Sequence, residues 1–265
     1  APGLVDRCNC GAHVDMDFYT FMSGAAALAM FFARCAQAGL NHNGPLPELL
    51  PVLRYIGTEG EKAMFEATSG VNTQKGLLFS LGLLSAAAAL VLRFGPVTGP
   101  DVLATAGKIA AGIVERELSG IAAVSQESMT SGQQLYYKFG VTGIRGEAEQ
   151  GLPAVVKALP VLREALNKGL SVNDALVQTL LVLMTLVDDT TVMHRHNLAK
   201  MRIWVRAEVQ EVLAAGGMFT IAGRHMVKKL DERFIAENVS PGGAADLLAA
   251  AWFIYRFEAV FNGQL

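Results

Sequence analysis

The stretch KGLLFSLGLLSAAAALVLR, residues 75–93, decides the fold class. It carries no charge between Lys75 and Arg93, and leucine and alanine, which favour helix, fill most of it. A membrane span needs about 20 apolar residues. This segment is shorter and is rich in Ala, Gly and Ser, which let helices approach closely. We therefore predict a central helix that is apolar nearly all round and packs among other helices.

The rest of the chain has the same helical character. Good helix formers dominate, apolar residues recur at three- and four-residue spacing, and alternating β-type runs are scarce. We predict an all-α fold, as a single compact multi-helix domain over residues 1–265. The expected helices lie near residues 20–38, 46–67, 75–94, 99–118, 153–168, 172–188, 197–215, 219–237 and 242–262.

Composition excludes some functions. The chain has 265 residues, of which 52% are hydrophobic, so a large core is expected. Its 22 basic and 24 acidic residues leave a net charge of −2, which gives no basic field for nucleic acid. Three cysteines and no signal-peptide pattern favour a cytoplasmic protein, and we expect no membrane role. Exposed apolar helix faces could pack against a second copy of the chain, so the sequence is compatible with a homodimer.

Polar and charged residues gather in five segments that are predicted to be irregular. In an apolar helical body, such clusters at helix ends are the natural place for a site. The segments are residues 3–17, 69–76, 139–151, 188–197 and 238–246.

The second of these segments is typical of an anion site. Residues 70–76, GVNTQKG, place two glycines, Asn72 and Lys75 directly before the apolar helix. The N-terminal turn of a helix offers unpaired N–H groups and the positive end of its dipole, and Lys75 would add a full charge. An ordinary helix cap explains the same residues.

The first segment, residues 3–17, carries carboxylates close to a histidine. In the first segment, His13, Asp15 and Asp17 combine oxygen ligands suited to Mg²⁺ with a proton carrier, although an ordinary hydrogen-bonded loop fits equally. Cys8-x-Cys10-x-x-His13 resembles part of a zinc site, but no second ligand pair follows.

Of the two acids Glu59 and Glu61, Glu61 is the better candidate for a site residue. Met64 and Phe65 at i+3 and i+4 place it beside the buried stripe of its helix, whereas Glu59 can pair with Lys62 in solvent.

The segment 139–151 surrounds Arg145 with glycines and follows it with Glu147. Glycine density suggests close approach of the backbone to a ligand, and Arg145 can contact a phosphate bidentately. A tight loop in which Arg145 pairs with Glu147 is the alternative.

The last two segments contain two acids that follow a predicted helix and two residues that are typical of a helix start. Asp188-Asp189 follow a predicted helix, where acids are disfavoured, so a cation or nearby basic residues must compensate. Ser240 and Pro241 are typical of an N-cap and a first helical residue.

Taken together, the five segments resemble the triphosphoribosyl-dephospho-CoA synthase family. The match rests on motifs that occur in order along nearly the whole chain. They are PGLVDRCNCGAHVDMDF, IGTEGEKAMFEATSGVNTQKGLLFSLGLL, YKFGVTGIRGEAEQGLP, DDTTVMHR and NVSPGGAADLL. The resemblance implies an all-α enzyme that joins ATP to 3′-dephospho-CoA and releases adenine. Its product is the prosthetic-group precursor for the acyl carrier protein of citrate lyase or malonate decarboxylase, which a further transferase attaches.

The implied reaction is a glycosyl transfer, in which a 2′-hydroxyl displaces adenine at the anomeric carbon of the ATP ribose. It needs Mg²⁺, cations for an intact triphosphate, and a base for the hydroxyl proton. As Mg²⁺ ligands, directly or through water, we hypothesise Asp15, Glu61 and Asp189. Glu147 is the first choice for the base and His13 the second.

Phosphate binding is assigned to three cationic side chains in this hypothesis. They are Lys75, Arg145 and Arg195, with Asn72 and the local backbone assisting.

The chain also departs from the family pattern. The family usually has His at Gln74, Asn at Thr191 and Gly-Gly at His196-Asn197. Members carry a helix before the PGLVD motif, so we expect that Ala1 is not the native start.

Two rival functions are weighed against this one. An isoprenoid-synthase-like enzyme is also all-α and binds Mg-pyrophosphate, but its Asp-Asp-x-x-Asp motif is missing after Asp188-Asp189. A non-catalytic helical module would leave the polar segments unexplained.

Overall fold

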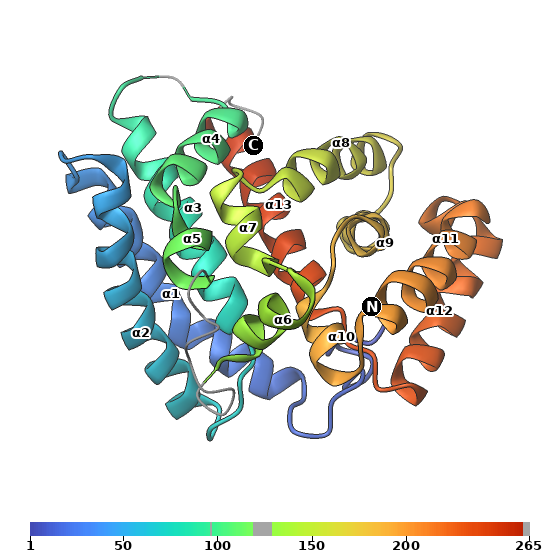
Figure 1. Cartoon of the computed structure of the whole chain (residues 1–265). Coiled ribbons are helices and arrows are strands. Elements are labelled where there is room, and N and C mark those ends of the chain that lie inside the picture. The colour runs from blue at the N-terminus through green and yellow to red at the C-terminus, as the bar shows by residue number, and fades with distance from the viewer. Residues whose placement is uncertain (96, 119–128, 262–265) are drawn as a thin grey trace. The chain divides into compact units, whose positions relative to one another are not determined.

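The computed structural model describes residues 1–95, 97–118 and 129–261, and every regular element within those ranges is helical (Figure 1). This confirms the predicted all-α fold.

Two compact units share the chain, and each is assembled from three separate segments. The first unit consists of Ala1–Phe18, Val114–Gly143 and Ala154–Leu248. The second unit consists of Tyr19–Ile113, Ile144–Pro153 and Ala249–Leu265. The units interleave along the chain, so no single point in the sequence marks a boundary between them. A single domain over residues 1–265 stays a prediction.

The second unit is built around α3 (Lys75–Leu92), which carries no charge between Lys75 and Arg93. Leu84, Ala86 and Ala87 on this helix are fully buried. At Gly39 the backbones come so close that a Cβ there would lie 2.1 Å from the carbonyl oxygen of Ala86. The other helices are α1 (Phe18–Asn41), η1 (Leu46–Glu48), α2 (Leu49–Ala67), α4 (Gly99–Ile109), α7 (Gly143–Glu149) and most of α13 (Gly242–Phe261).

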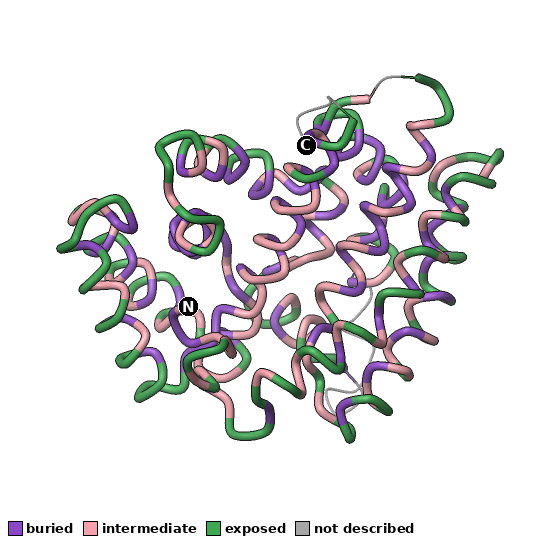
Figure 2. Tube along the Cα trace, turned by 180° about the vertical axis from the view of Figure 1, so that it is seen from behind, coloured by how far each residue is buried: buried purple, intermediate pink, exposed green. Residues whose placement is uncertain are grey.

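Buried and exposed positions alternate along the helices with the helical repeat (Figure 2). In α2, the buried residues Leu53, Ile56, Gly60 and Met64 recur at three- and four-residue spacing. One stripe of α2 therefore faces the core, and the residues beside that stripe are left to form the wall of a site.

The first unit has α9 (Val172–Leu186) at its centre. Leu181, Leu183 and Met184 are fully buried there, as the apolar composition of this stretch predicts. The remaining helices are α5 (Ile113–Leu118), α6 (Ser131–Phe139), α8 (Pro153–Asn167), α10 (Thr190–Arg195), the π-helical η4 (Lys200–Val205), α11 (Arg206–Ala214), η5 (Gly217–Phe219) and α12 (Ile221–Ala236).

Helix boundaries differ from the predictions in a few places. The segments 139–151 and 188–197, which we predicted to be irregular, contain the short helices α7 and α10. The helix predicted over 99–118 is interrupted at Gly112, whose φ of +74° the α-helix does not allow. Helix α6 was not predicted, although its capping box from Thr130 to Gln133 is visible in the sequence. Residue 262 of the last predicted helix lies outside the described residues.

Two helices, α1 and α3, are long and apolar enough to cross a membrane by length and composition alone. Our prediction from the sequence considered α3 as a membrane span but overlooked α1. Half of the apolar window of α3 is buried within the protein, and 22% of that of α1 is buried. The absence of a membrane role stays a prediction.

Candidate functional site

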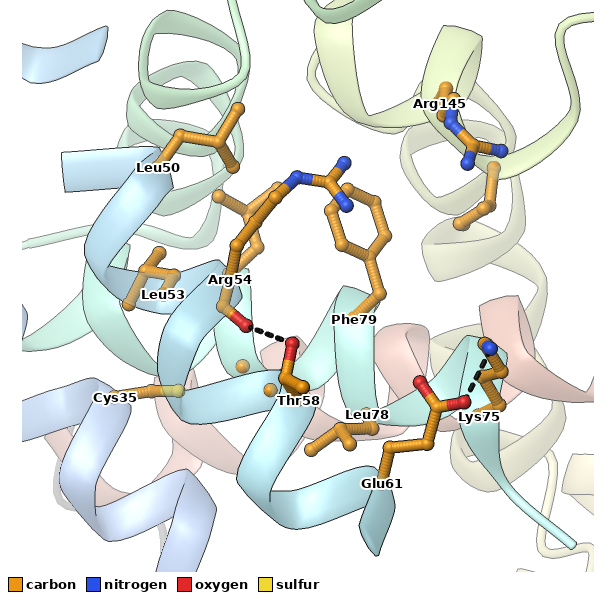
Figure 3. A pocket seen from close by; sticks show the side chains of 15 residues that line it. Cys35, Leu50, Leu53, Arg54, Thr58, Glu61, Lys75, Leu78, Phe79 and Arg145 are labelled. Carbon is orange, nitrogen blue, oxygen red and sulfur yellow. Dashed lines mark hydrogen bonds and ion pairs between the residues drawn. The ribbon is translucent and has the colours of Figure 1, made fainter. Parts of the chain in front are cut away.

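A groove between α2 and α3 is the main candidate site, and it lies wholly within the second unit (Figure 3). One face of α2, from Leu50 to Glu61, forms one wall, and one face of α3, from Lys75 to Leu83, forms the other. Cys35 of α1 and the Ile144-Arg145 pair of α7 complete it. The cavity measures about 210 Å³.

One end of the groove is charged. Glu61 and Lys75 form an ion pair across it, and Arg145 lines the same groove further along, apart from this pair (Figure 3). Gly76, in the first turn of α3, also lines the groove. The structure thus brings together Glu61, Lys75 and Arg145, which were predicted from three separate motifs. Glu59 instead pairs with Arg34 of α1 at 2.5 Å, so its predicted pairing with Lys62 is replaced.

The loop before α3 supports this end of the groove without lining it. Asn72 Oδ1 accepts a 3.1 Å hydrogen bond from the backbone N–H of Lys75, which is a capping role. Gln74 is buried, with 5% of its surface exposed, and its side chain lies beside Gly24 of α1. Residue 74, where the family usually has His, is therefore buried and does not line the groove.

Sequence reasoning missed two residues in the middle of the groove. The guanidinium of Arg54 lies over the ring of Phe79, with its central carbon 5.6 Å from the ring centroid. The signal was present, because Arg54, Thr58 and Glu61 follow one another at four- and three-residue spacing on one face of α2.

Glu147 lies on α7, two residues after Arg145. Residues two apart on a helix point about 200° apart, so the two side chains leave the helix on nearly opposite sides. Arg145 lines the groove, and Glu147 is not among the described residues that do.

A second polar cluster lies within the first unit and centres on His13. Its Nε2 atom lies 2.9 Å from the hydroxyl of Ser240, and Nδ1 lies 3.5 Å from a carboxylate oxygen of Asp15. Arg195 donates toward the imidazole at 3.3 Å. Three of the predicted site residues, His13, Asp15 and Arg195, therefore meet here.

Backbone and side-chain acceptors hold Arg195 in place. Its Nη1 atom donates to the carbonyl oxygen of Ala12 at 2.6 Å and to Oδ1 of Asn238 at 3.1 Å. Burial and the charge of Arg195 lower the pKa of His13 below 6.5, and Asp15 opposes the shift. His13 is consequently neutral near pH 7, as a proton acceptor must be.

Asp189 is buried and caps two helices at once. One carboxylate oxygen accepts from the N–H groups of Thr191 and Val192 at the start of α10. The other accepts from Ala244 in the first turn of α13 at 2.8 Å. Burial raises the pKa of Asp189, while the backbone N–H groups that point at it act in the opposite direction.

These contacts change the roles of two predicted residues. Ser240, which we predicted to cap α13, binds His13 instead, and Asp189 provides the capping carboxylate. The N–H groups around Asp189 occupy both of its oxygens, so the geometry gives it a structural role. Ligation of Mg²⁺ by Asp189 stays a prediction.

Two arginines compensate the negative charge of Asp188. Arg202 donates to it at 2.5 Å and 3.0 Å, and Arg206 donates at 3.0 Å. Nearby arginines therefore compensate this carboxylate. The preceding helix α9 ends at Leu186, so neither acid lies inside its last turn.

The predicted metal ligands do not form a preformed cluster. Across the part of the chain that the structure describes, no three His, Cys, Asp or Glu side chains are grouped to hold a metal ion. Mg²⁺ commonly enters nucleotide sites on substrate phosphates and takes only one or two carboxylates from the protein. Asp15, with 58% of its side chain exposed, and Glu61, at the mouth of the groove, fit that manner of binding.

Comparison with known proteins places the chain in one family. A family model for ATP:dephospho-CoA triphosphoribosyl transferase, CitG, matches residues 1–264. No solved structure matches the chain.

Proposed function

The chain belongs to the ATP:dephospho-CoA triphosphoribosyl transferase family, and on that premise we propose that the groove between α2 and α3 binds the triphosphate of ATP. The protein is a transferase that joins the triphosphoribosyl group of ATP to 3′-dephospho-CoA with release of adenine. The family match gives no support to an isoprenoid-synthase-like enzyme or a non-catalytic module.

One observation carries this proposal: two cationic side chains and the first turn of a long helix line a single groove. Lys75 and Arg145 line it together with Gly76 in the first turn of α3. Helix N-termini bind phosphates through backbone N–H groups and the helix dipole. Without substrate Lys75 pairs with Glu61, and a triphosphate would compete for that lysine.

Mg²⁺ is proposed to arrive with ATP. When bound, it neutralises part of the triphosphate charge. Glu61 at the groove and Asp15 beside His13 are the candidate protein ligands, directly or through water. Asp189 stays in the hypothesis as a third ligand that its capping contacts disfavour.

The proton of the attacking hydroxyl is proposed to go to Glu147, although its side chain does not line the groove, with His13 as the second candidate. The 2′-hydroxyl oxygen forms a bond to the anomeric carbon of the ATP ribose as the bond from that carbon to N9 of adenine breaks. Adenine leaves with the electron pair of that bond and takes up one proton, which balances the proton that the base removes from the hydroxyl. Neutral His13 can accept a proton, and the new charge on its ring would face the carboxylate of Asp15 at 3.5 Å. Arg195 beside it is proposed to bind a phosphate.

The product is proposed to pass to a second transferase that loads an acyl carrier protein, either of citrate lyase or of malonate decarboxylase. We also propose that the enzyme works in the cytoplasm, without nucleic acid or membrane, and that a homodimer is its oligomeric form.

Inorganic tripolyphosphate tests the groove assignment. It should inhibit competitively with ATP, and Lys75→Ala should weaken this inhibition at least tenfold and raise the KM for ATP. Lys157→Ala, at an exposed position of α8, is the control. Equal inhibition of Lys75→Ala and of the native enzyme would remove the triphosphate from this groove.

A further inference from the structure

We propose that the middle of the groove, between Arg54, Gly57 and Phe79, binds the adenine ring of ATP. This inference rests on the proposed function, because it places the base next to the triphosphate end of the same groove.

Arg54 and Phe79 provide a stacking surface. The guanidinium of Arg54 packs 5.6 Å from the centroid of the Phe79 ring (Figure 3). A planar guanidinium has two faces, and arginine stacks readily on aromatic rings. A purine can pack against this pair, because every base offers a π-face.

Glycines leave room for a flat ring. A Cβ placed on Gly57 would meet no atom within 4 Å, so this position of α2 opens into empty space. Across the groove, a Cβ on Gly82 of α3 would meet only the sulfur of Cys35, at 3.2 Å. Both glycines line the groove.

The size of the groove agrees with part of a nucleotide. Its 210 Å³ exceeds the roughly 150 Å³ cavity that holds a benzene ring. It is smaller than the roughly 300–1,000 Å³ pockets that enclose drug-sized ligands. A purine ring and its ribose fit these limits, with the triphosphate reaching out at the charged end, whereas ATP together with dephospho-CoA does not fit.

The order of residues along both walls matches the order of groups in ATP. On α2, Gly57 lies four residues before Glu61, and on α3, Phe79 lies four residues after Lys75. Four residues span about 6 Å of helix on each wall. The stacking surface and the cationic end are therefore separated by about the room that a ribose needs.

The apolar remainder of the lining suits a base better than a phosphate. Leu50, Leu53 and Leu83 continue the groove beyond the Arg54 and Phe79 pair. Desolvating a phosphate against leucine side chains would be costly, whereas a purine face buries favourably there.

Adenine also occurs in dephospho-CoA, so the experiment must separate the two sources. Gly57→Leu fills the open space, and it improves helix propensity in α2 by roughly 0.8 kcal/mol, which protects folding. Ala33→Leu, at an exposed position of α1, is the matched control. The measurements are the KM values for ATP and for dephospho-CoA, and inhibition by free adenine and by inorganic tripolyphosphate.

Gly57→Leu is expected to raise the KM for ATP at least tenfold and to weaken inhibition by adenine. It should leave the KM for dephospho-CoA and the tripolyphosphate inhibition unchanged. Arg54→Ala should have the same pattern, and Arg54→Lys should not restore binding, because lysine has no flat face. An unchanged KM for ATP, or a rise in the KM for dephospho-CoA alone, would overturn the inference.

Failure of the adenine site and failure of the triphosphate site are distinguishable. If Lys75→Ala leaves tripolyphosphate inhibition intact, the triphosphate assignment fails. Adenine inhibition in Gly57→Leu still tests the base site in that case, because free adenine carries no phosphate.

Discussion

The carboxylate of Asp189 accepts a 2.8 Å hydrogen bond from the backbone N–H of Ala244, 55 residues further along the chain. Through its other oxygen it caps α10, so one buried side chain joins two motifs that the sequence showed only as separate loops. His13, Arg195 and Ser240 meet beside this junction.

Replacing Asp189 should destabilise the protein strongly. Asp189→Ala leaves at least three buried or half-buried N–H groups without their acceptor, and each costs about 1–3 kcal/mol. We expect a loss of at least about 3 kcal/mol in the free energy of unfolding, measured by urea denaturation.

Asp101→Ala provides the comparison, because Asp101 serves the capping box of α4 alone and is exposed. Loss of one such cap costs about 1 kcal/mol. An equal loss in the free energy of unfolding for the two substitutions would show that the double cap stabilises the protein no more than a single cap.

Acid should weaken the contacts of Asp188. The hydrogen bond from Arg202 and the charges of Arg202 and Arg206 hold the pKa of Asp188 below 3.8, although burial opposes them. The folded state therefore binds fewer protons than the unfolded state, so this stabilisation is present above about pH 4 and is lost as the pH falls through the lower folded pKa. The difference in free energy of unfolding between native protein and Asp188→Asn should shrink over that range.

The pH dependence of Lys168→Ala serves as the control, since its ion pair with Glu164 is exposed. A difference between native protein and Asp188→Asn that stays constant from pH 5 to pH 2.5 would contradict the assigned shift.

Periodicity and composition predicted the fold well, because α3 and α9 are apolar on nearly every side and can only be core helices. The resemblance to a known family, which rests on the order of the motifs, led to the assignment of Glu61, Lys75 and Arg145 to one site. Short helices such as α10 were missed because their stability comes from a cap, Asp189, and from packing rather than from an apolar period.

Other parts of the site depend on contacts between distant segments. Ser240 looked like a cap from its neighbours Pro241 and Gly242, and only the structure shows its hydroxyl on His13. Gln74 belongs to a glycine-rich segment that we predicted to be irregular, yet it is buried beside Gly24. Neither contact leaves a local pattern in the sequence.

Glu147→Gln tests the proposed base. The amide cannot take the hydroxyl proton, so kcat should fall by about 10²–10⁴, while ATP binding stays close to native. Stopped-flow or steady-state kinetics with calorimetric ATP binding would measure the two quantities separately.

Glu164→Gln, on an exposed face of α8, is the matched control. A near-normal kcat in Glu147→Gln would move the base role to His13, for which His13→Gln should then produce the large loss.

Magnesium dependence separates the candidate ligands. Glu61→Gln and Asp15→Asn should each raise the Mg²⁺ concentration for half-maximal activity several-fold, because each removes a charged oxygen ligand. Asp189→Asn should lower stability and leave that concentration unchanged. A several-fold shift in Asp189→Asn, with normal stability, would instead establish Asp189 as a ligand.

Adenine release from ATP, followed with and without dephospho-CoA, tests the central claim most directly. The account predicts that adenine appears only when both substrates are present, in equal amount to a product whose mass is that of dephospho-CoA plus the triphosphoribosyl group. It further predicts that Lys75→Ala shifts this release to higher ATP concentrations. Absence of adenine with both substrates, or release of pyrophosphate in its place, would contradict it.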